Sequence, residues 1–178
     1  AIGLPIAIAL GSEKFLALLE GAQSIDQHFA STPFEKNIPV LLAYLDFIYV
    51  NVLNISSIAV LPYSDKLRLL PDYLQQLLME SNGKSVRNNG EPTPGHTSPV
   101  YWGSAGTVGQ HSFHQLLHQG THIIACEFVL PLNTNTGKTD EDKREIHLAA
   151  NCLAQSKALL EGKSVSYTHL RAHETNQD

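Results

Sequence analysis

The sequence has few of the residues that mark several protein classes. It has two cysteines in 178 residues, Cys126 and Cys152, and they show no metal-ligand spacing. One lies in an apolar run and the other in a helical pattern, so we expect buried thiols, which fits a reducing compartment such as the cytoplasm. The chain also lacks a basic stripe, since 12 Lys and Arg face 17 Asp and Glu. That balance argues against nucleic-acid binding.

Long hydrophobic runs are missing as well. The apolar segment 1–10 contains Gly3 and Pro5, lacks a basic leading region and is too short to span a bilayer, so we expect no membrane segment. It is typical of a core helix whose beginning has been lost. The absence of a starting Met points the same way, to a fragment. What is present is a hydrophobic content of 43%, enough for one packed domain.

Apolar runs alternate with amphipathic segments along the chain. Helical periodicity predicts helices, the second of them opened by a capping box at Thr32–Glu35, and short apolar runs between turn residues predict strands. The helices are expected over 12–29, 33–52, 71–80, 109–119 and from 139 onward, and the strands over 58–61, 100–102 and 123–130. The segment 82–98 is rich in Gly, Pro and Asn and predicts a loop. This alternation predicts a three-layer α/β/α sandwich with a mainly parallel sheet.

The predicted helix 109–119 gives a geometric argument about function. At 100° per residue, its apolar and polar side chains separate onto two sides. The apolar side must pack on the sheet, so we expect the other side to face solvent, a partner or a ligand. A metal site is a second possibility, although the pattern is not that of a metalloprotease helix. The two sides carry Phe113, Leu116 and Leu117, and His111, His114, Gln115 and His118.

Two further features are typical of a ligand site. Gly103, Gly106 and Gly109 lie between a strand and a helix N-terminus, where backbone N–H groups can approach an anion, although the spacing differs from the dinucleotide fingerprint. Glu80 ends a helix, where the dipole disfavours negative charge, and this suits a general base near neutral pH. Simpler alternatives stay open: a tight turn for the glycines, a solvated side chain for Glu80, and an exposed polar face for the histidines.

Several long motifs, in the right order, resemble those of phosphoglucose isomerases. They are QQLLMESNGK at 75–84, Trp102-Gly103, GTVGQH at 106–111 and QLLHQGT at 115–121, with similar stretches at 28–42 and 153–159. The resemblance covers residues 1–163 and implies an incomplete second sugar-isomerase domain with a flavodoxin-like fold. We expect residues 164–178, which do not look like the family, to be disordered or artefactual.

The resemblance implies an activity and a set of site residues. Enzymes of that family interconvert glucose 6-phosphate and fructose 6-phosphate through an enediol, without a metal or organic cofactor. By resemblance, Glu80 is the base that moves the proton, and His118 assists ring opening in the other subunit of a homodimer. Gln76 is expected at the sugar phosphate, as are Gly109 and Gln110 of the glycine-rich motif.

The chain departs from the family pattern at Leu77-Leu78, Ser104-Ala105, His114 and His122, but none of these changes removes Glu80 or His118. The first domain, with its phosphate-binding loop, is absent, so we expect little or no isomerase activity from this chain alone. Two alternatives remain: a non-catalytic sugar-phosphate-binding module of the same fold, and a His-rich interaction or metal-binding protein. The presence of both Glu80 and His118 favours the enzyme.

Overall fold

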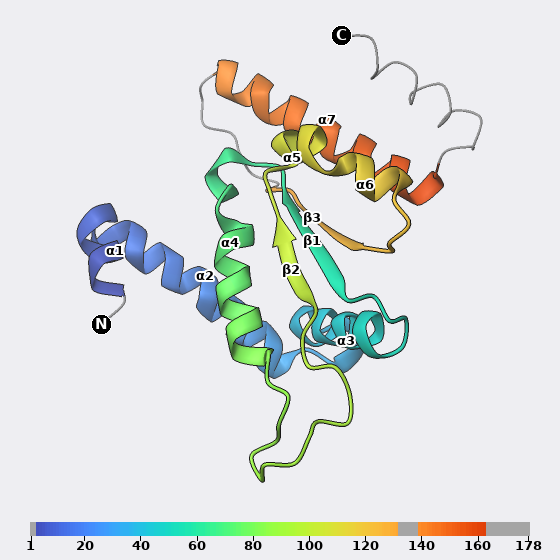
Figure 1. Ribbon diagram of the computed structural model, residues 1–178. Coiled ribbons are helices and arrows are strands. Elements are labelled where there is room, and N and C mark those ends of the chain that lie inside the picture. The colour runs from blue at the N-terminus through green and yellow to red at the C-terminus, as the bar shows by residue number, and fades with distance from the viewer. Residues whose placement is uncertain (1–2, 132–138, 163–178) are drawn as a thin grey trace. The chain divides into compact units, whose positions relative to one another are not determined.

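The structure is a computed structural model that describes residues 3–131 and 139–162. The chain forms two compact units, residues 1–48 and 49–178, and each is described by itself. The first unit is all helical, and the second contains the sheet (Figure 1).

The first unit consists of α1 (Gly3–Leu10), α2 (Ser12–Ser31), the 3-10 helix η1 (Phe34–Lys36) and most of α3 (Ile38–Asn51). The second helix follows the prediction, and the two helices contact each other. The expectation of a core helix over 1–10 is wrong for this structure, because α1 is helical but has no buried residue. Their large apolar side chains, such as Leu4 and Phe29, are mostly exposed.

The start of α3 corrects the sequence prediction. The expected capping box opens only the short helix η1, and α3 begins at Ile38. Its true cap is the buried Asn37, whose Oδ1 accepts a hydrogen bond from the Val40 backbone N–H at 3.4 Å. The Asn37 amide also donates to the Phe29 carbonyl at 2.8 Å. These bonds use up the polar groups of the buried amide, which is why the helix starts there.

The second unit is built on three parallel strands in the order β2-β1-β3. They are β1 (Ser57–Pro62), β2 (Val100–Gly103) and β3 (Ala125–Val129), each within two residues of its predicted bounds. In the central strand, Ile58 lies opposite Tyr101 on one side and Ala125 on the other. Residues 58–62 of β1 are fully buried, as a strand covered on both faces should be.

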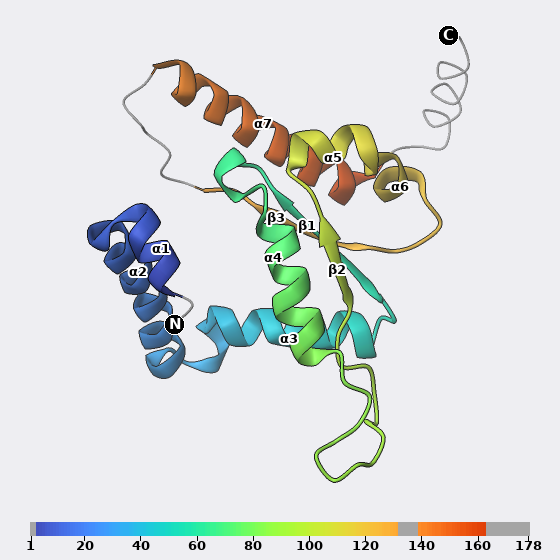
Figure 2. The same cartoon turned by 60° about the vertical axis from the view of Figure 1, so that its left-hand side comes forward.

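The two faces of the sheet carry separate apolar cores, because successive side chains of a strand point to opposite faces. On the face here called the α4 face, Ile58 and Val60 pack with α4 (Leu70–Leu74) and the π-helix η3 (Gln75–Glu80). On the α6 face, Ala59, Leu61 and Tyr63 pack with side chains around α5 (Gly106–Ser112), α6 (His114–Gln119) and α7 (Thr139–Glu161). Figures 1 and 2 show α4 on one side of the sheet and α5, α6 and α7 on the other. The predicted α/β/α layering is therefore confirmed.

The predicted helix 109–119 is broken, and this changes which side chains are buried. The chain leaves the helical conformation at Phe113, with φ −140° and ψ 0°, so α5 and α6 are separate helices. The Phe113 ring packs edge-on against Trp102, with centroids 4.7 Å apart. Because one continuous period no longer applies, His114 is buried while Leu116 is 42% exposed. The expectation that His114 faces outward is wrong.

The segment that links η3 to β2 is irregular, as predicted. Its one pairing among the described residues outside the named strands is an antiparallel bridge between Val86 and Pro92. The Asn51 side chain holds the segment by donating to the His96 carbonyl at 3.1 Å and accepting from the His96 N–H at 3.0 Å. None of the helices in the described ranges is long and apolar enough to cross a bilayer.

Candidate active site

Glu80 is the last residue of η3, and its side chain is 75% exposed. Its Oε2 accepts a hydrogen bond from Ser81 Oγ at 3.5 Å, and its Oε1 lies 3.9 Å from Lys84 Nζ. The Lys84 ammonium also donates to the Glu80 backbone carbonyl. Gln76, four residues earlier in the same π-helix, is exposed as well. Both side chains are thus open to a ligand. π-Helical turns are rare in proteins, and those that occur are often found at functional sites.

A polar hollow of about 300 Å³ lies directly after Glu80 in the chain. It is lined by Lys84 and by residues from both ends of the segment 83–98. Thr97 Oγ1 donates to the Lys84 carbonyl at 3.0 Å and so joins these two ends. Glu80 itself does not line the hollow. The first lining residue, Gly83, follows three residues after Glu80, at which η3 ends.

His118 is half-buried in the last turn of α6. Its Nε2 lies 3.0 Å from Oε1 of Gln155, which belongs to α7. The ring of His114 is on the same helix, with its centroid 6.2 Å from that of His118. His118 is therefore held by a second helix as well as by its own.

His114 is buried, and neither of its ring nitrogens has a regular hydrogen-bond partner in the described part of the chain. Burial lowers the pKa of His114, and the nearby His118 acts in the same direction. The backbone of Gly109 opposes this effect without reversing it. His114 is thus a neutral ring at physiological pH, packed against the stacked ring of Phe113.

The glycine-rich turn provides room for close packing. A Cβ atom on Gly106 would lie 2.2 Å from the ring of the buried Tyr63, and one on Gly109 would lie 2.7 Å from Cζ of Phe113. The Gly109 N–H already donates to the Ala105 carbonyl at 2.9 Å. These distances support the tight-turn alternative for the glycines. An anion contact at this turn stays a prediction.

Gln110 connects the turn to the strand beneath it. Its Nε2 donates to the hydroxyl oxygen of Tyr63 at 3.4 Å. Burial raises the pKa of Tyr63, so this phenol stays protonated. Half-buried Gln110 therefore belongs to the packing of α5 on the sheet, and its place at a substrate also stays a prediction.

The five predicted site residues fall on two faces of one sheet. Glu80 and Gln76 lie on η3, which packs on the α4 face through Leu78 and Met79. His118, Gly109 and Gln110 lie on α5 and α6, on the α6 face. Because the sheet lies between them, one chain does not bring Glu80 and His118 together. The sequence argument missed Gln155, whose only signal was its position within the stretch 153–159.

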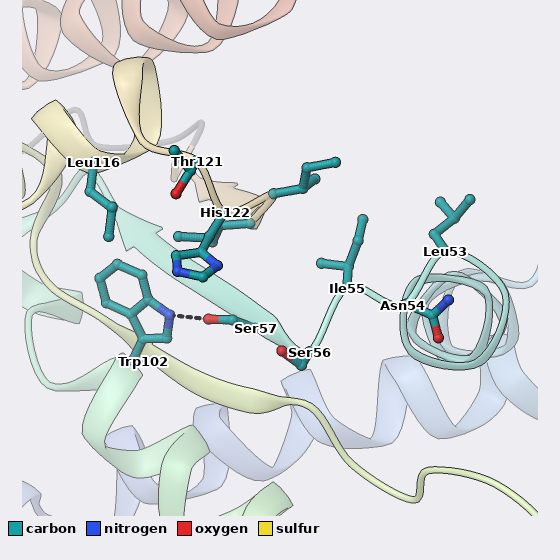
Figure 3. A pocket seen from close by; sticks show the side chains of 11 residues that line it. Leu53, Asn54, Ile55, Ser56, Ser57, Trp102, Leu116, Thr121 and His122 are labelled. Carbon is teal, nitrogen blue, oxygen red and sulfur yellow. Dashed lines mark hydrogen bonds between the residues drawn. The ribbon is translucent and has the colours of Figure 1, made fainter.

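A larger pocket, of about 490 Å³, lies where β1 and β3 begin (Figure 3). Figure 3 shows Trp102, His122 and Leu116 around it, and the Trp102 indole N–H donating to Ser57 Oγ at 2.6 Å. None of the five predicted site residues lines this pocket. Across the part of the chain that the structure describes, no group of three or more His, Cys, Asp or Glu side chains could hold a metal ion.

Comparison with known proteins identifies the family. The sequence model of phosphoglucose isomerase matches residues 1–177. The chain belongs to the phosphoglucose isomerase family. This confirms the resemblance found in its motifs. The predicted division at residue 163 and the expected non-family tail concern residues outside the described ranges and stay predictions.

Curated members of the phosphoglucose isomerase family are similar over nearly the whole chain. A glucose-6-phosphate isomerase from Pseudomonas savastanoi pv. phaseolicola is 53% identical over 92% of this chain and 29% of its own length. One from Pseudomonas syringae pv. syringae is 49% identical over 100% of this chain and 32% of its own length. The chain thus spans about 30% of the length of the relatives it matches.

Solved structures agree with this assignment. A glucose-6-phosphate isomerase from Chlamydia trachomatis superposes with a TM-score of 0.69 at 40% identity, over 81% of this chain and 29% of that one. A hypothetical protein from Thermus thermophilus gives a TM-score of 0.64 at 25% identity, over 82% and 36%. The three-layer fold therefore matches the fold of one part of a solved glucose-6-phosphate isomerase.

Proposed function

We propose that this chain is part of an aldose–ketose isomerase that interconverts glucose 6-phosphate and fructose 6-phosphate. The support comes from relatives named glucose-6-phosphate isomerase that are about half identical over 92% or more of the chain. In this proposal the enzyme works in the cytoplasm, in glycolysis and gluconeogenesis. The chain spans about 30% of such a relative, so by itself it turns over little substrate.

Glu80 is the proposed base of the proton transfer. It removes the proton from C2 of the open-chain aldose, and the electrons form the C1–C2 double bond of the enediolate. The proton of the O2 hydroxyl moves to O1, and Glu80 returns the carbon-bound proton to C1 to give the ketose. This role is supported by the exposure of the Glu80 carboxylate, whose side chain is 75% exposed and contacts Lys84 and Ser81. Exposed Gln76 on the same helix is proposed to contact the same substrate molecule. Gly109 and Gln110 lie on the α6 face, so they are proposed to contact the substrate in the neighbouring subunit's site, as His118 does.

His118 is proposed to assist sugar ring opening in the site of a neighbouring subunit. The observation that carries this proposal is the position of Glu80 and His118 on opposite faces of one sheet. Two residues so placed do not reach one substrate molecule, whereas a two-fold symmetric dimer can bring Glu80 of one subunit to His118 of the other. The proposal therefore requires a homodimer.

Subunit complementation tests the activity and the shared site together. A chimera would carry this chain in place of the matching third of the Pseudomonas savastanoi relative. We expect Glu80→Gln and His118→Asn each to lower kcat by about 10²- to 10⁴-fold, the usual contribution of a positioned acid or base. The two variants are then mixed and refolded together. In every mixed dimer, one site combines Glu80 of the His118→Asn subunit with His118 of the Glu80→Gln subunit, and that site is intact.

The mixture should recover about one quarter of the wild-type activity, because half of the dimers are mixed and one of their two sites is intact. If His118 serves its own chain, every site stays defective and nothing is recovered. A wild-type chimera that dimerises without isomerising would instead favour a non-catalytic sugar-phosphate-binding module.

A further inference from the structure

We propose that Gln155 is a positioning residue that keeps a proton on Nε2 of His118, so that Nδ1 is the proton acceptor. The inference deepens the proposed function, because it specifies which atom of His118 takes part in ring opening. It starts from the 3.0 Å contact between His118 Nε2 and Gln155 Oε1, which joins α6 to α7.

The chemistry of the contact decides the tautomer. An amide oxygen only accepts hydrogen bonds, so the nitrogen that faces it must carry a proton. At 3.0 Å the two atoms are at the usual N–H···O distance. In a neutral imidazole one nitrogen is a donor and the other an acceptor. Protonated Nε2 therefore leaves the lone pair on Nδ1.

The surroundings of Gln155 make the contact a fixed one. Cys152, one turn earlier on α7, is buried in the core of the α6 face. Gln155 is half-buried, so solvent competes little for its oxygen. The packing of α7 thus determines where the amide oxygen lies.

The neighbouring His114 does not compete for His118. Its buried ring nitrogens have no regular hydrogen-bond partner among residues 3–131 and 139–162, and the two imidazole rings are tilted by 40° with centroids 6.2 Å apart. That spacing allows ring packing and no ring-to-ring hydrogen bond. His114 therefore limits the movement of the His118 ring, and Gln155 selects the protonated nitrogen.

This arrangement assigns the proton path of ring opening. The Nδ1 lone pair accepts the proton of the sugar's anomeric hydroxyl, and the C1–O5 bond breaks as the C1 carbonyl forms. The His118 imidazolium then delivers that proton from Nδ1 to the ring oxygen, which returns the ring to its Nε2–H form. Removing the Gln155 oxygen should leave both tautomers populated and should also free the His118 ring to turn, so only a small part of the enzyme would present an oriented acceptor at Nδ1. The loss should appear in kcat, because Gln155 touches His118 and not the sugar.

The first test is nitrogen-15 NMR of the full 178-residue chain labelled at histidine, with the His118 signals assigned by their loss in His118→Asn. We expect the Nε2–H pattern in the wild type and in Gln155→Glu, which keeps an acceptor oxygen, and an averaged pattern in Gln155→Leu. Asn151→Leu is the matched control, since Asn151 is exposed one turn earlier on α7 and bonds its own helix. An Nδ1–H pattern in the wild type, or an unchanged one in Gln155→Leu, would overturn the proposal.

The second test is the kinetics of the chimera. Gln155→Leu should lower kcat at least about tenfold, since acid–base catalysis by a positioned group is worth about 10²–10⁴-fold. We expect KM to stay within about twofold, Gln155→Glu to restore most of kcat, and Asn151→Leu to behave as wild type. If His118→Asn is inactive while Gln155→Leu is not impaired, the positioning role is wrong and the proposed function stands. An inactive wild-type chimera would refute the proposed function, and the NMR experiment alone would then decide the tautomer.

Discussion

The two faces of the sheet hold their candidate catalytic residues in different ways. On the α4 face, Glu80 is 75% exposed, and its hydrogen bond and ion pair are to Ser81 and Lys84, within four residues. On the α6 face, His118 is half-buried and bonded to Gln155, which is 37 residues away in the sequence. The position of Glu80 thus depends on neighbours in the sequence, whereas the position of His118 depends on tertiary packing.

This difference has a consequence for how each residue can be perturbed. A locally held side chain depends on its own helix end, so distant substitutions should leave Glu80 in place. A side chain held by packing depends on every element that packs beside it, here α5, α6 and α7. Changes in the core of the α6 face should therefore have larger effects on stability than changes beside Glu80.

The largest expected effect on stability comes from Gly106→Ala. The added Cβ would lie 2.2 Å from the buried ring of Tyr63, so the ring or α5 must move. Overpacking of this kind costs about 1–3 kcal/mol of the free energy of unfolding. Urea unfolding followed by the fluorescence of Trp102, the one tryptophan, reports directly on this face.

Gly21→Ala is the matched control for this substitution. Nothing lies within 4 Å of a Cβ at that position in the middle of α2, and alanine is favoured over glycine in a helix by about 0.5–1 kcal/mol. We expect this variant to leave the Trp102 transition at or above its wild-type midpoint. Equal losses in the two variants would mean that Gly106 is not needed for packing on Tyr63.

The features that could be predicted from the sequence are those that depend on local contacts, and the features that could not be predicted depend on long-range contacts. The strands were predictable because their apolar runs end at turn residues, and the place of Glu80 at a helix end followed from local periodicity. The break at Phe113 was not predictable, because it depends on the packing of that ring against Trp102. The contact between His118 and Gln155 joins two helices that periodicity treats separately.

The start of α3 shows the same limit on a smaller scale. Thr32–Glu35 fits a capping box, yet the buried Asn37 provides the cap, since its amide also bonds the end of α2 at Phe29. A tertiary contact thus outweighed a good local motif. For the site, the sequence located Glu80 and His118, whereas their separation by the sheet became visible only in the fold.

A smaller effect, of opposite sign, is expected for His114→Phe. In the part of the chain that the structure describes, the buried His114 nitrogens have no regular hydrogen-bond partner, so replacing this ring by an apolar one should raise the free energy of unfolding by about 1 kcal/mol. The pKa of His114 is lowered in the folded chain, so the unfolded chain takes up the proton first as the pH falls. This proton uptake favours the unfolded chain, so the free energy of unfolding of the wild type decreases as the pH falls below 6.5, the ordinary pKa.

Thermal unfolding at about pH 7.5 and about pH 5 checks this prediction, and the two values are chosen on either side of that ordinary pKa. The advantage of His114→Phe over the wild type should be larger at the lower pH. His111→Phe serves as the control, because His111 is exposed on the neighbouring helix α5. If His114→Phe loses stability at both pH values, the ring nitrogens have partners that stabilise the fold, and the α6 face is less apolar than described.

The smallest effect is expected beside Glu80. Lys84→Met removes the cation of the ion pair with Glu80, but the two side chains are 59% and 75% exposed, so water and salt screen their attraction. Exposed pairs of this kind contribute about 0–1 kcal/mol, and we expect a change in the free energy of unfolding below about 0.5 kcal/mol. Urea unfolding at low and high salt measures it, and the difference between variant and wild type should shrink further at high salt. A loss above about 1 kcal/mol would lie outside the range for exposed pairs. Glu80 would then be anchored as firmly as His118, and the contrast between the two faces would not hold.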